Sequence, residues 1–297
     1  MNVLLDTPKH DDLIYDVGMH KGEDTDFYLR KGFRVVAFEA DPELAGHCRE
    51  RFQDYIRRGR LTVVEGAIVS PDSMAAGNKV RFYRNRELSV WGTVEAGWAE
   101  RNARLGTSSS VTEVEAIDFV SALRQHGIPH YMKIDIEGLD IVCVTALGRF
   151  RERPDYISME SDKTSLAKIR REIETLAGLG YDSFQAVEQS KIPHSQPPPN
   201  LAREGNYVAQ QFEPDSSGLF GAELAGEWMS KDAILRRYAF IRLGYYLVGD
   251  DGVLNRLRFR GAWRLRSMTV NLLKRLTREA VPGWYDTHAR HSSVGAG

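Results

Sequence analysis

The sequence predicts an α/β fold in which a doubly wound, largely parallel sheet carries helices on both faces. A short apolar run, residues 13–17, precedes a glycine turn, an amphipathic run that ends at Gly32, and a second apolar run, residues 35–38. This order of strand, turn, helix and strand is the nucleotide-binding half of such a sheet. Strand-like and helix-like segments then alternate along much of the chain to residue 187, which predicts further strands in the same sheet.

The glycine turn restricts which nucleotide can bind. It reads Asp16-Val-Gly18-Met-His-Lys-Gly22, one glycine short of the dinucleotide fingerprint G-x-G-x-x-G. Three acidic residues follow at the start of the helix: Glu23, Asp24 and Asp26. A pyrophosphate binds at a helix N-terminus because the amides there favour anions, and these carboxylates would oppose it. A ligand with positive groups and no phosphate fits better, and S-adenosylmethionine is such a ligand.

Each part of this motif has an expected contact with the cofactor. We expect Asp16 to face the ammonium group, and the turn from Gly18 to Gly22 to pass beneath the methionyl part. Glu39, at the end of the second strand, is expected to bind both ribose hydroxyls. The alternative is that the glycines only form a tight turn and that Glu39 is a solvated strand end.

The composition is typical of a globular protein. Of the 297 residues 42% are hydrophobic and 27% charged, and the net charge of −1 gives no reason to expect a nucleic-acid partner. No stretch resembles a signal peptide or reaches the length of a membrane span. Cys48 and Cys143 lack metal-ligand spacing and are expected to be buried free thiols, which favours a reducing, cytoplasmic setting.

A polar lead-in, residues 1–12, precedes these elements. A helix is predicted over residues 42–55 and a third strand over residues 61–69. Glu65 and Ala67 in this strand stand where a sheet of this kind reads the adenine edge. A simple strand end is the alternative interpretation.

Residues 70–117 interrupt the alternation of strands and helices. The runs 79–83 and 111–115 predict an inserted pair of short strands. Between them, residues 88–93 form a candidate wall of the substrate site, with simple packing of Trp91 as the alternative.

A helix capped by Asp118 leads to a second chemically distinctive stretch, His130-Tyr-Met-Lys-Ile-Asp-Ile-Glu-Gly138. We predict a strand that ends in Lys133, Asp135 and Glu137, whose side chains share one face. Ionisable groups are costly to bury without a purpose, and ligands bind at the carboxyl ends of such strands. These residues are therefore candidate catalytic groups, and an ion-pair network built on Lys133 is the alternative.

The next elements continue the alternation: helices 139–150 and 164–179, and strands 155–161, 181–187 and 206–212. If the last two strands form an antiparallel hairpin, the proline-rich loop 189–205 lies over the carboxyl ends of the sheet as a lid. His194 in this loop is a candidate catalytic residue, and a solvated loop histidine is the alternative.

The pattern changes after residue 213, which divides the chain into a domain of residues 1–213 and a mainly helical extension of residues 214–297. Eight Arg or Lys and no acidic residue stand between residues 256 and 278. This segment indicates contact with an anionic partner or a membrane surface, or a basic helix docked on the acidic body of the same chain. Residues 283–288 are too polar and aromatic for an ordinary tail, and residues 292–297 are expected to be disordered.

Three motifs together resemble the FkbM family of S-adenosylmethionine-dependent methyltransferases: Asp16-Val-Gly18-x-x-x-Gly22, Phe38-Glu39-Ala-Asp-Pro42 and Lys133-Ile-Asp-Ile-Glu-Gly138. The resemblance spans roughly residues 12–190. It implies a class I methyltransferase sheet and O-methylation of hydroxyls on sugars or secondary metabolites. It also implies cofactor contacts at Asp16, Gly18 and Glu39, and acceptor-side chemistry near Asp135 and Glu137.

The sequence thus predicts methyl transfer from S-adenosylmethionine to a small-molecule hydroxyl acceptor. The carboxylate of Asp135 or Glu137, or the imidazole of His194, would take the hydroxyl proton, and Lys133 would position the carboxylates. A divalent ion that bridges Asp135 and Glu137 to a vicinal diol is an alternative, although no dedicated set of metal ligands is visible. Two other classes stay open: an NAD-dependent oxidoreductase, which would share Glu39, and a non-catalytic nucleotide-binding module that binds a partner through its basic segment.

Overall fold

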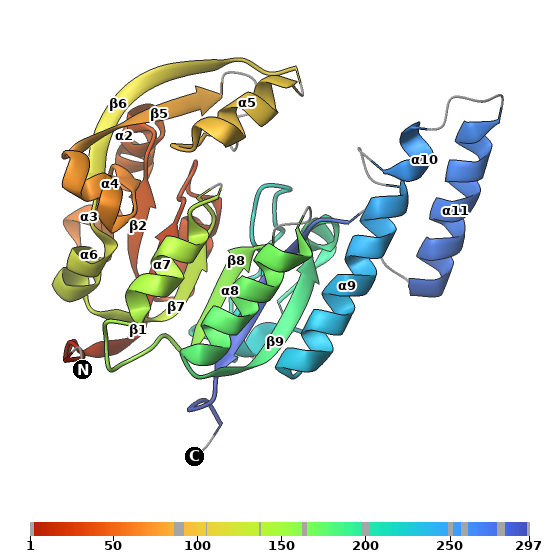
Figure 1. The fold of residues 1–297 in the computed structure, drawn as a ribbon. Coiled ribbons are helices and arrows are strands. Elements are labelled where there is room, and N and C mark those ends of the chain that lie inside the picture. Colours follow the sequence, from red (N-terminus) through yellow and green to blue (C-terminus); the bar gives the residue numbers. More distant parts are fainter. Residues whose placement is uncertain are drawn as a thin grey trace.

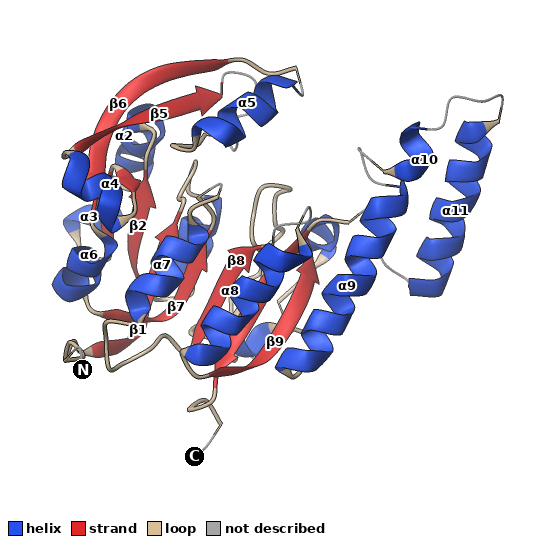
Figure 2. Ribbon diagram, in the orientation of Figure 1, coloured by secondary structure: helices blue, strands red, loops and turns tan. Residues whose placement is uncertain are grey.

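The computed structural model of the chain is built around one large twisted sheet with helices on both faces (Figures 1 and 2). It describes residues 3–85, 92–104, 106–136, 138–161, 165–197, 202–248, 252–256, 261–277 and 283–295. The sheet has seven strands in the order β3-β2-β1-β7-β8-β10-β9. Their bounds are β1 Lys9–Val17, β2 Arg34–Glu39, β3 Leu61–Glu65, β7 Ile128–Ile134, β8 Tyr156–Glu160, β9 Tyr181–Glu188 and β10 Tyr285–His291. Of the strand pairs, only those made by β10 are antiparallel, so this is the predicted class I methyltransferase sheet.

Two apolar layers hold the helices on the sheet. One core joins the sheet to α6 Phe119–His126, α7 Asp140–Leu147, α8 Leu166–Gly178 and α9 Lys231–Val248. The other joins it to α1 Glu23–Arg30, α2 Pro42–Arg51 and the segment 208–224. Alternate strand residues face the two layers, and a cavity lies at the carboxyl ends of β1, β2 and β7.

The helix expected over residues 42–55 is interrupted at Phe52, and α3 Gln53–Arg57 follows it. Phe52 has φ −109° and ψ 21°, outside the helical region, and its ring is buried against Gly22. The tight packing of this ring under the glycine turn accounts for the break.

The predicted third strand, residues 61–69, is wrong as a single element. It splits at Gly66 into β3 and the short β4 Ala67–Ile68, which belongs to a separate three-stranded sheet. Gly66 has φ +139°, and a Cβ there would lie 2.7 Å from the carbonyl oxygen of Glu115, so only glycine fits this bend. The small sheet confirms the predicted insertion, because β5 Lys79–Asn85 and β6 Ser109–Ile117 pair antiparallel in it. Two helices accompany it: α4 Pro71–Ala76 and α5 Ala96–Arg104.

The predicted hairpin between residues 181–187 and 206–212 is also wrong. The partner of β9 is β10, from residues 285–291, and β10 is inserted between β8 and β9. Residues 206–212 form no strand, and the ring of Phe212 instead packs edge-on against that of Phe27, with the ring centroids 5.0 Å apart. The expected extension therefore does not run to the end of the chain, since its last described part returns to the main sheet.

Two further helices, α10 Val253–Arg256 and α11 Ala262–Thr277, follow α9 beyond the β9 side of the sheet (Figure 1). After β10 the chain makes a turn in which the amide of Ser292 donates to the carbonyl of Gly180 at 3.0 Å, so the expected disorder does not begin at Ser292. Among the described helices, none is long and apolar enough to cross a membrane.

Candidate active site

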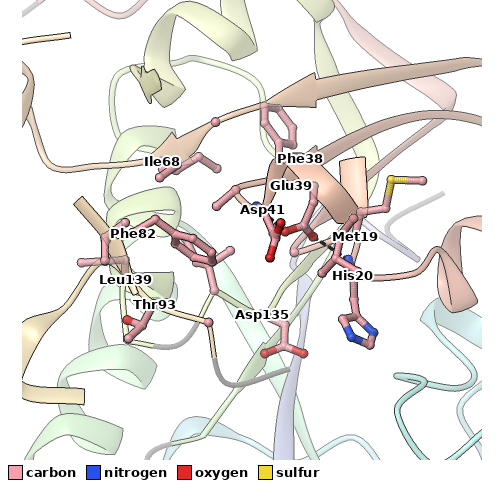
Figure 3. A pocket seen from close by; sticks show the side chains of 18 of the residues that line it. Met19, His20, Phe38, Glu39, Asp41, Ile68, Phe82, Thr93, Asp135 and Leu139 are labelled. Atoms are coloured by element: carbon pink, nitrogen blue, oxygen red, sulfur yellow. Dashed lines mark hydrogen bonds between the residues drawn. The ribbon is translucent and has the colours of Figure 1, made fainter. Parts of the chain in front are cut away.

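A cavity open to solvent lies at the carboxyl ends of β1, β2 and β7. Its walls come from the turn after β1, the ends of β2 and β7, the start of β4, strand β5, residues 92–94 and Asp215. In Figure 3 the side chains of Glu39, Asp41 and Asp135 border this space, with Ile68 and Phe82 on another side. The cavity thus has acidic groups beside an apolar wall, at the edge of the sheet where ligands are expected.

The glycine turn is forced into its shape by close neighbours. Gly18 has φ +89°, and a Cβ on it would lie 1.9 Å from the carbonyl oxygen of Asp135. Gly22 has φ +82°, forms the N-cap of α1, and leaves room for the Phe52 ring, whose Cε2 atom would be 2.4 Å from a Cβ. Gly18 lines the cavity and Gly22 does not. The motif therefore lets the backbone approach both the ligand space and the end of β7.

Glu39 is held at the end of β2 by two backbone amides. One carboxylate oxygen accepts from the amide of His20 at 2.7 Å, and the other from the amide of Asp41 at 2.8 Å. His20 has φ +53°, an uncommon conformation for a residue with a side chain, and it places its amide at Glu39. Burial raises the pKa of Glu39 to about 7, and the two amides oppose that rise. Each oxygen has a second lone pair, so a diol can bind without displacing either amide.

Lys133 is the cation at the centre of the site. Its Nζ donates to the carbonyl oxygen of Gly18 at 2.6 Å and lies 3.3 Å from Asp16 and 3.9 Å from Asp135. Burial lowers the pKa of Lys133, but the carboxylates of Asp16, Asp135 and Asp24 outweigh burial and raise the pKa above its usual value. Lys133 thus joins the glycine turn of β1 to the end of β7 through a charged group that stays protonated.

Asp16 and Asp135 both lie near this lysine but differ in their exposure. Asp16 is completely buried, accepts from the Thr25 hydroxyl at 2.6 Å, and does not line the cavity. Asp135 follows the last residue of β7, lines the cavity, and keeps 45% of its side chain exposed. The structure therefore brings Lys133 and Asp135 together, as the strand pattern predicted. Glu137 lies outside the described residues.

Several other candidates lie away from the cavity. Ala67 lines it, whereas Glu65 points outward and pairs with Arg49 at 2.5 Å. His194 is exposed at the end of the short helix η2 Gln189–His194 and does not line the cavity. The predicted wall, residues 88–93, contributes Gly92 and Thr93, while Trp91 lies outside the described residues.

The predicted lid is wrong for the end of the loop 189–205. Glu204 bonds at 2.7 Å to His130, whose strand begins at Ile128, so this part of the loop lies at the amino edge of the sheet. Glu204 is buried in this position, and its carboxylate also accepts from the amide of Ala222 at 2.7 Å. Residues 198–201 lie outside the described residues. The segment that reaches the cavity is instead the one that contains Asp215.

Sequence reasoning missed the roles of Asp24 and of residues 215–217 at the cavity. The buried carboxylate of Asp24 lines the cavity and accepts from the amide of Ser217, with both oxygens 3.0 Å away. Burial, reinforced by the charge of Asp16, raises the pKa of Asp24. The acidic start of α1 was a usable signal for Asp24. Nothing local pointed to Asp215, which is brought in from nearly two hundred residues along the chain.

A comparison with protein families identifies the family of this chain. The model of the methyltransferase FkbM domain matches residues 16–183, more than half of the chain. The chain belongs to this family. Residues 16–183 thus form a methyltransferase domain of the FkbM type, as the three motifs implied. The oxidoreductase alternative, which rested on Glu39 alone, is not retained.

A curated relative matches a shorter stretch of the FkbM-family chain. It is a probable ribosomal RNA small subunit methyltransferase A from Haloarcula marismortui, 39% identical over 79 residues. The match covers 26% of this chain and only 28% of the relative.

Solved structures of other methyltransferases are similar at low identity. An O-methyltransferase from Bacillus cereus in complex with SAH has 16% identity and a TM-score of 0.35, over 60% of this chain and 67% of that one. A SAM-dependent methyltransferase from Thiobacillus denitrificans in complex with S-adenosyl-L-homocysteine has 10% identity and a TM-score of 0.34, over 96% of this chain and 86% of that one. Both TM-scores lie below 0.5, and we draw no conclusion from these likenesses.

Proposed function

We propose that this FkbM-family protein is an O-methyltransferase that methylates a hydroxyl group of a sugar or a secondary metabolite. The observation that carries the proposal is the carboxylate of Asp135. It lies in the cavity at the end of β7, beside the glycine turn, with one oxygen 3.9 Å from the Nζ of Lys133. A positioned carboxylate next to a methyl donor is suited to take the proton of a hydroxyl that attacks the methyl group.

The residues of the cavity fit S-adenosylmethionine. Gly18 lines the cavity, so the turn offers backbone to the methionyl part, while its missing Cβ leaves room for the Asp135 carbonyl. The free lone pairs of Glu39 suit the ribose diol, and Ala67, Ile68 and Phe82 offer an apolar wall for adenine. Asp24 lines the same cavity and suits the ammonium group. We assign to Asp16 an indirect role, because it reaches the cavity only through Lys133.

The chain contributes position and a proton acceptor to the reaction. When bound, S-adenosylmethionine supplies a methyl group on a sulfonium leaving group. Asp135 accepts the hydroxyl proton as the oxygen attacks the methyl carbon and the carbon–sulfur electron pair stays on sulfur. Lys133 holds Asp135 to the turn, so acceptor and donor are aligned before reaction. None of the described His, Cys, Asp and Glu side chains gather into a group that could hold a metal ion.

The proposal is tested in two steps. Calorimetry of the purified protein with S-adenosylhomocysteine and with NAD should show binding of the first ligand alone. Transfer of a labelled methyl group is then measured over a panel of sugars and hydroxylated secondary metabolites, with matched amine analogues as controls. Label on hydroxyls supports the proposal. Binding of S-adenosylhomocysteine with label only on amines would refute O-methylation while leaving the family activity intact.

A further inference from the structure

Helix α11 has an apolar stripe that faces away from the protein. Leu265, Met268 and Leu272 are spaced three and four residues apart, so they share one face of the helix, and they are exposed by 43% to 69%. The opposite face is the one that packs, because Arg266 is partly buried and donates from its guanidinium to the carbonyl of Val248 at 3.1 Å. The stripe is therefore not the surface that attaches α11 to α9.

Helix α9 has a similar division between an inner and an outer face. Its inner face is fixed to the sheet through Tyr238, whose hydroxyl bonds Ser161 at 2.7 Å and Thr287 at 2.6 Å. On the outer face three large side chains are at least half exposed: Phe240, Leu243 and Tyr246. Exposed apolar groups at this density are more than the scattered single residues of an ordinary surface.

The charged side chains from residue 256 to residue 278 are all positive. Eight Arg or Lys stand between residues 256 and 278, without a single Asp or Glu. Arg264 and Arg275 are exposed on α11 and, by helix geometry, lie on one flank of the stripe. The guanidinium of Arg264 lies over the indole ring of Trp263, 5.4 Å from its centroid, and Trp263 is itself largely exposed. Exposed arginines that flank an apolar stripe are typical of helices that lie on membranes.

We propose that α9 and α11 dock this protein on the surface of an anionic lipid bilayer. The apolar stripe of α11 enters the boundary between headgroups and acyl chains, and the flanking arginines bind lipid phosphates. Nucleic acid would need the positive charge but not the exposed Leu and Met side chains. With 16 residues, α11 is about 24 Å long and lies in the interface rather than crossing it.

The position of α11 is compatible with a working enzyme. Figure 1 places α11 beyond α9 on the β9 side of the sheet, whereas the cofactor cavity lies at β1, β2, β7 and the small sheet. None of the seven exposed large hydrophobic residues described on α9 and α11 lines the cavity. A bilayer on the outer faces of α9 and α11 therefore leaves the cavity accessible.

The test is flotation of the full chain with lipid vesicles. We expect the protein to float with vesicles of equal parts phosphatidylcholine and phosphatidylglycerol, and not with vesicles of phosphatidylcholine alone. Raising the salt concentration should weaken binding.

Matched variants separate the surface from a general loss of folding. The triple variant Leu265→Ser, Met268→Ser, Leu272→Ser changes only exposed side chains and should lower vesicle affinity roughly tenfold or more. Val111→Ser removes an apolar side chain of similar exposure, 56%, on β6 and should leave affinity unchanged. Absence of flotation with the anionic vesicles would overturn the proposal. So would equal loss of affinity in the triple variant and the control, a dimer in solution that buries the stripe, or RNA binding in place of vesicle binding.

Discussion

Replacement of Gly18 by alanine should disrupt both the stability and the ligand site of the enzyme. The new Cβ would lie 1.9 Å from the carbonyl oxygen of Asp135, whereas ordinary contact begins near 3.4 Å, so one of the two backbones must move by about 1.5 Å. The φ of +89° adds about 1 kcal/mol of conformational strain for a residue with a side chain. Together these effects should lower the free energy of unfolding by about 3 kcal/mol or more.

The movement would also act on function, because Lys133 donates to the Gly18 carbonyl and Asp135 supplies the clashing oxygen. Urea unfolding gives the stability, and calorimetry with S-adenosylhomocysteine gives the affinity of whatever fraction stays folded. Gly46→Ala is the matched control. Gly46 lies inside α2, a Cβ there would meet nothing within 4 Å, and the substitution should stabilise the chain by roughly 0.5–1 kcal/mol. Wild-type stability and affinity in Gly18→Ala would refute the close approach of the turn to β7.

Three further changes test other groups. Glu39→Ala should weaken S-adenosylhomocysteine binding by about 1.5–3 kcal/mol. Because Glu39 protonates near pH 7, the wild-type affinity should fall as the pH drops through about 7. Calorimetry that finds the same pH dependence in a Glu39→Gln variant would contradict the assignment of Glu39 to ligand binding. Asp135→Asn should lower turnover by about 10²-fold with little change in cofactor affinity. Asp182→Asn, which changes an exposed residue of β9, is the control and should retain turnover. Near-normal turnover of Asp135→Asn would mean that another residue is the catalytic base. Burial lowers the pKa of His130, but Asp155 and Glu204 outweigh burial and raise this pKa to about 9. The stabilisation of the folded state by His130 is therefore complete below about pH 6.5 and is lost as pH rises through 9. His130→Gln should remove about 1–3 kcal/mol of pH-dependent unfolding free energy, and an unchanged pH profile in urea titrations would count against this assignment.

The sequence predicted the parts of the fold that are encoded by neighbouring residues. The strand, glycine turn and helix around Gly18 are local, and so is the alternation that placed Lys133 beside Asp135. Two failures had a physical cause in long-range pairing. The apolar run 61–69 continues through Gly66, and only the nearby Glu115 carbonyl shows why the chain must bend there. Residues 206–212 have a strand-like composition, but β10 occupies the place beside β9.

The site was predictable to the same extent. Glu39, Gly18, Lys133 and Asp135 belong to short motifs, and the structure gathers them at one cavity. Asp215 and the wall that contains Phe82 come from segments whose approach depends on the whole fold. His194 is a candidate only if its loop lies over the carboxyl ends, and the end of that loop, at Glu204, lies at the amino edge of the sheet instead. A loop position derived from an assumed strand pairing is only as sound as that pairing.

The insertion of β10 between β8 and β9 has a consequence for the order in which the protein matures on the ribosome. The five strands from β3 to β8 are complete once residue 160 has been made, and they can pair as they emerge. Among the described strands, β9, finished at residue 188, pairs only with β10 and must wait for about a hundred more residues. During that interval its edge is unpaired, and so is that of β8, which makes nascent chains of this length the stage most exposed to aggregation and to chaperone capture.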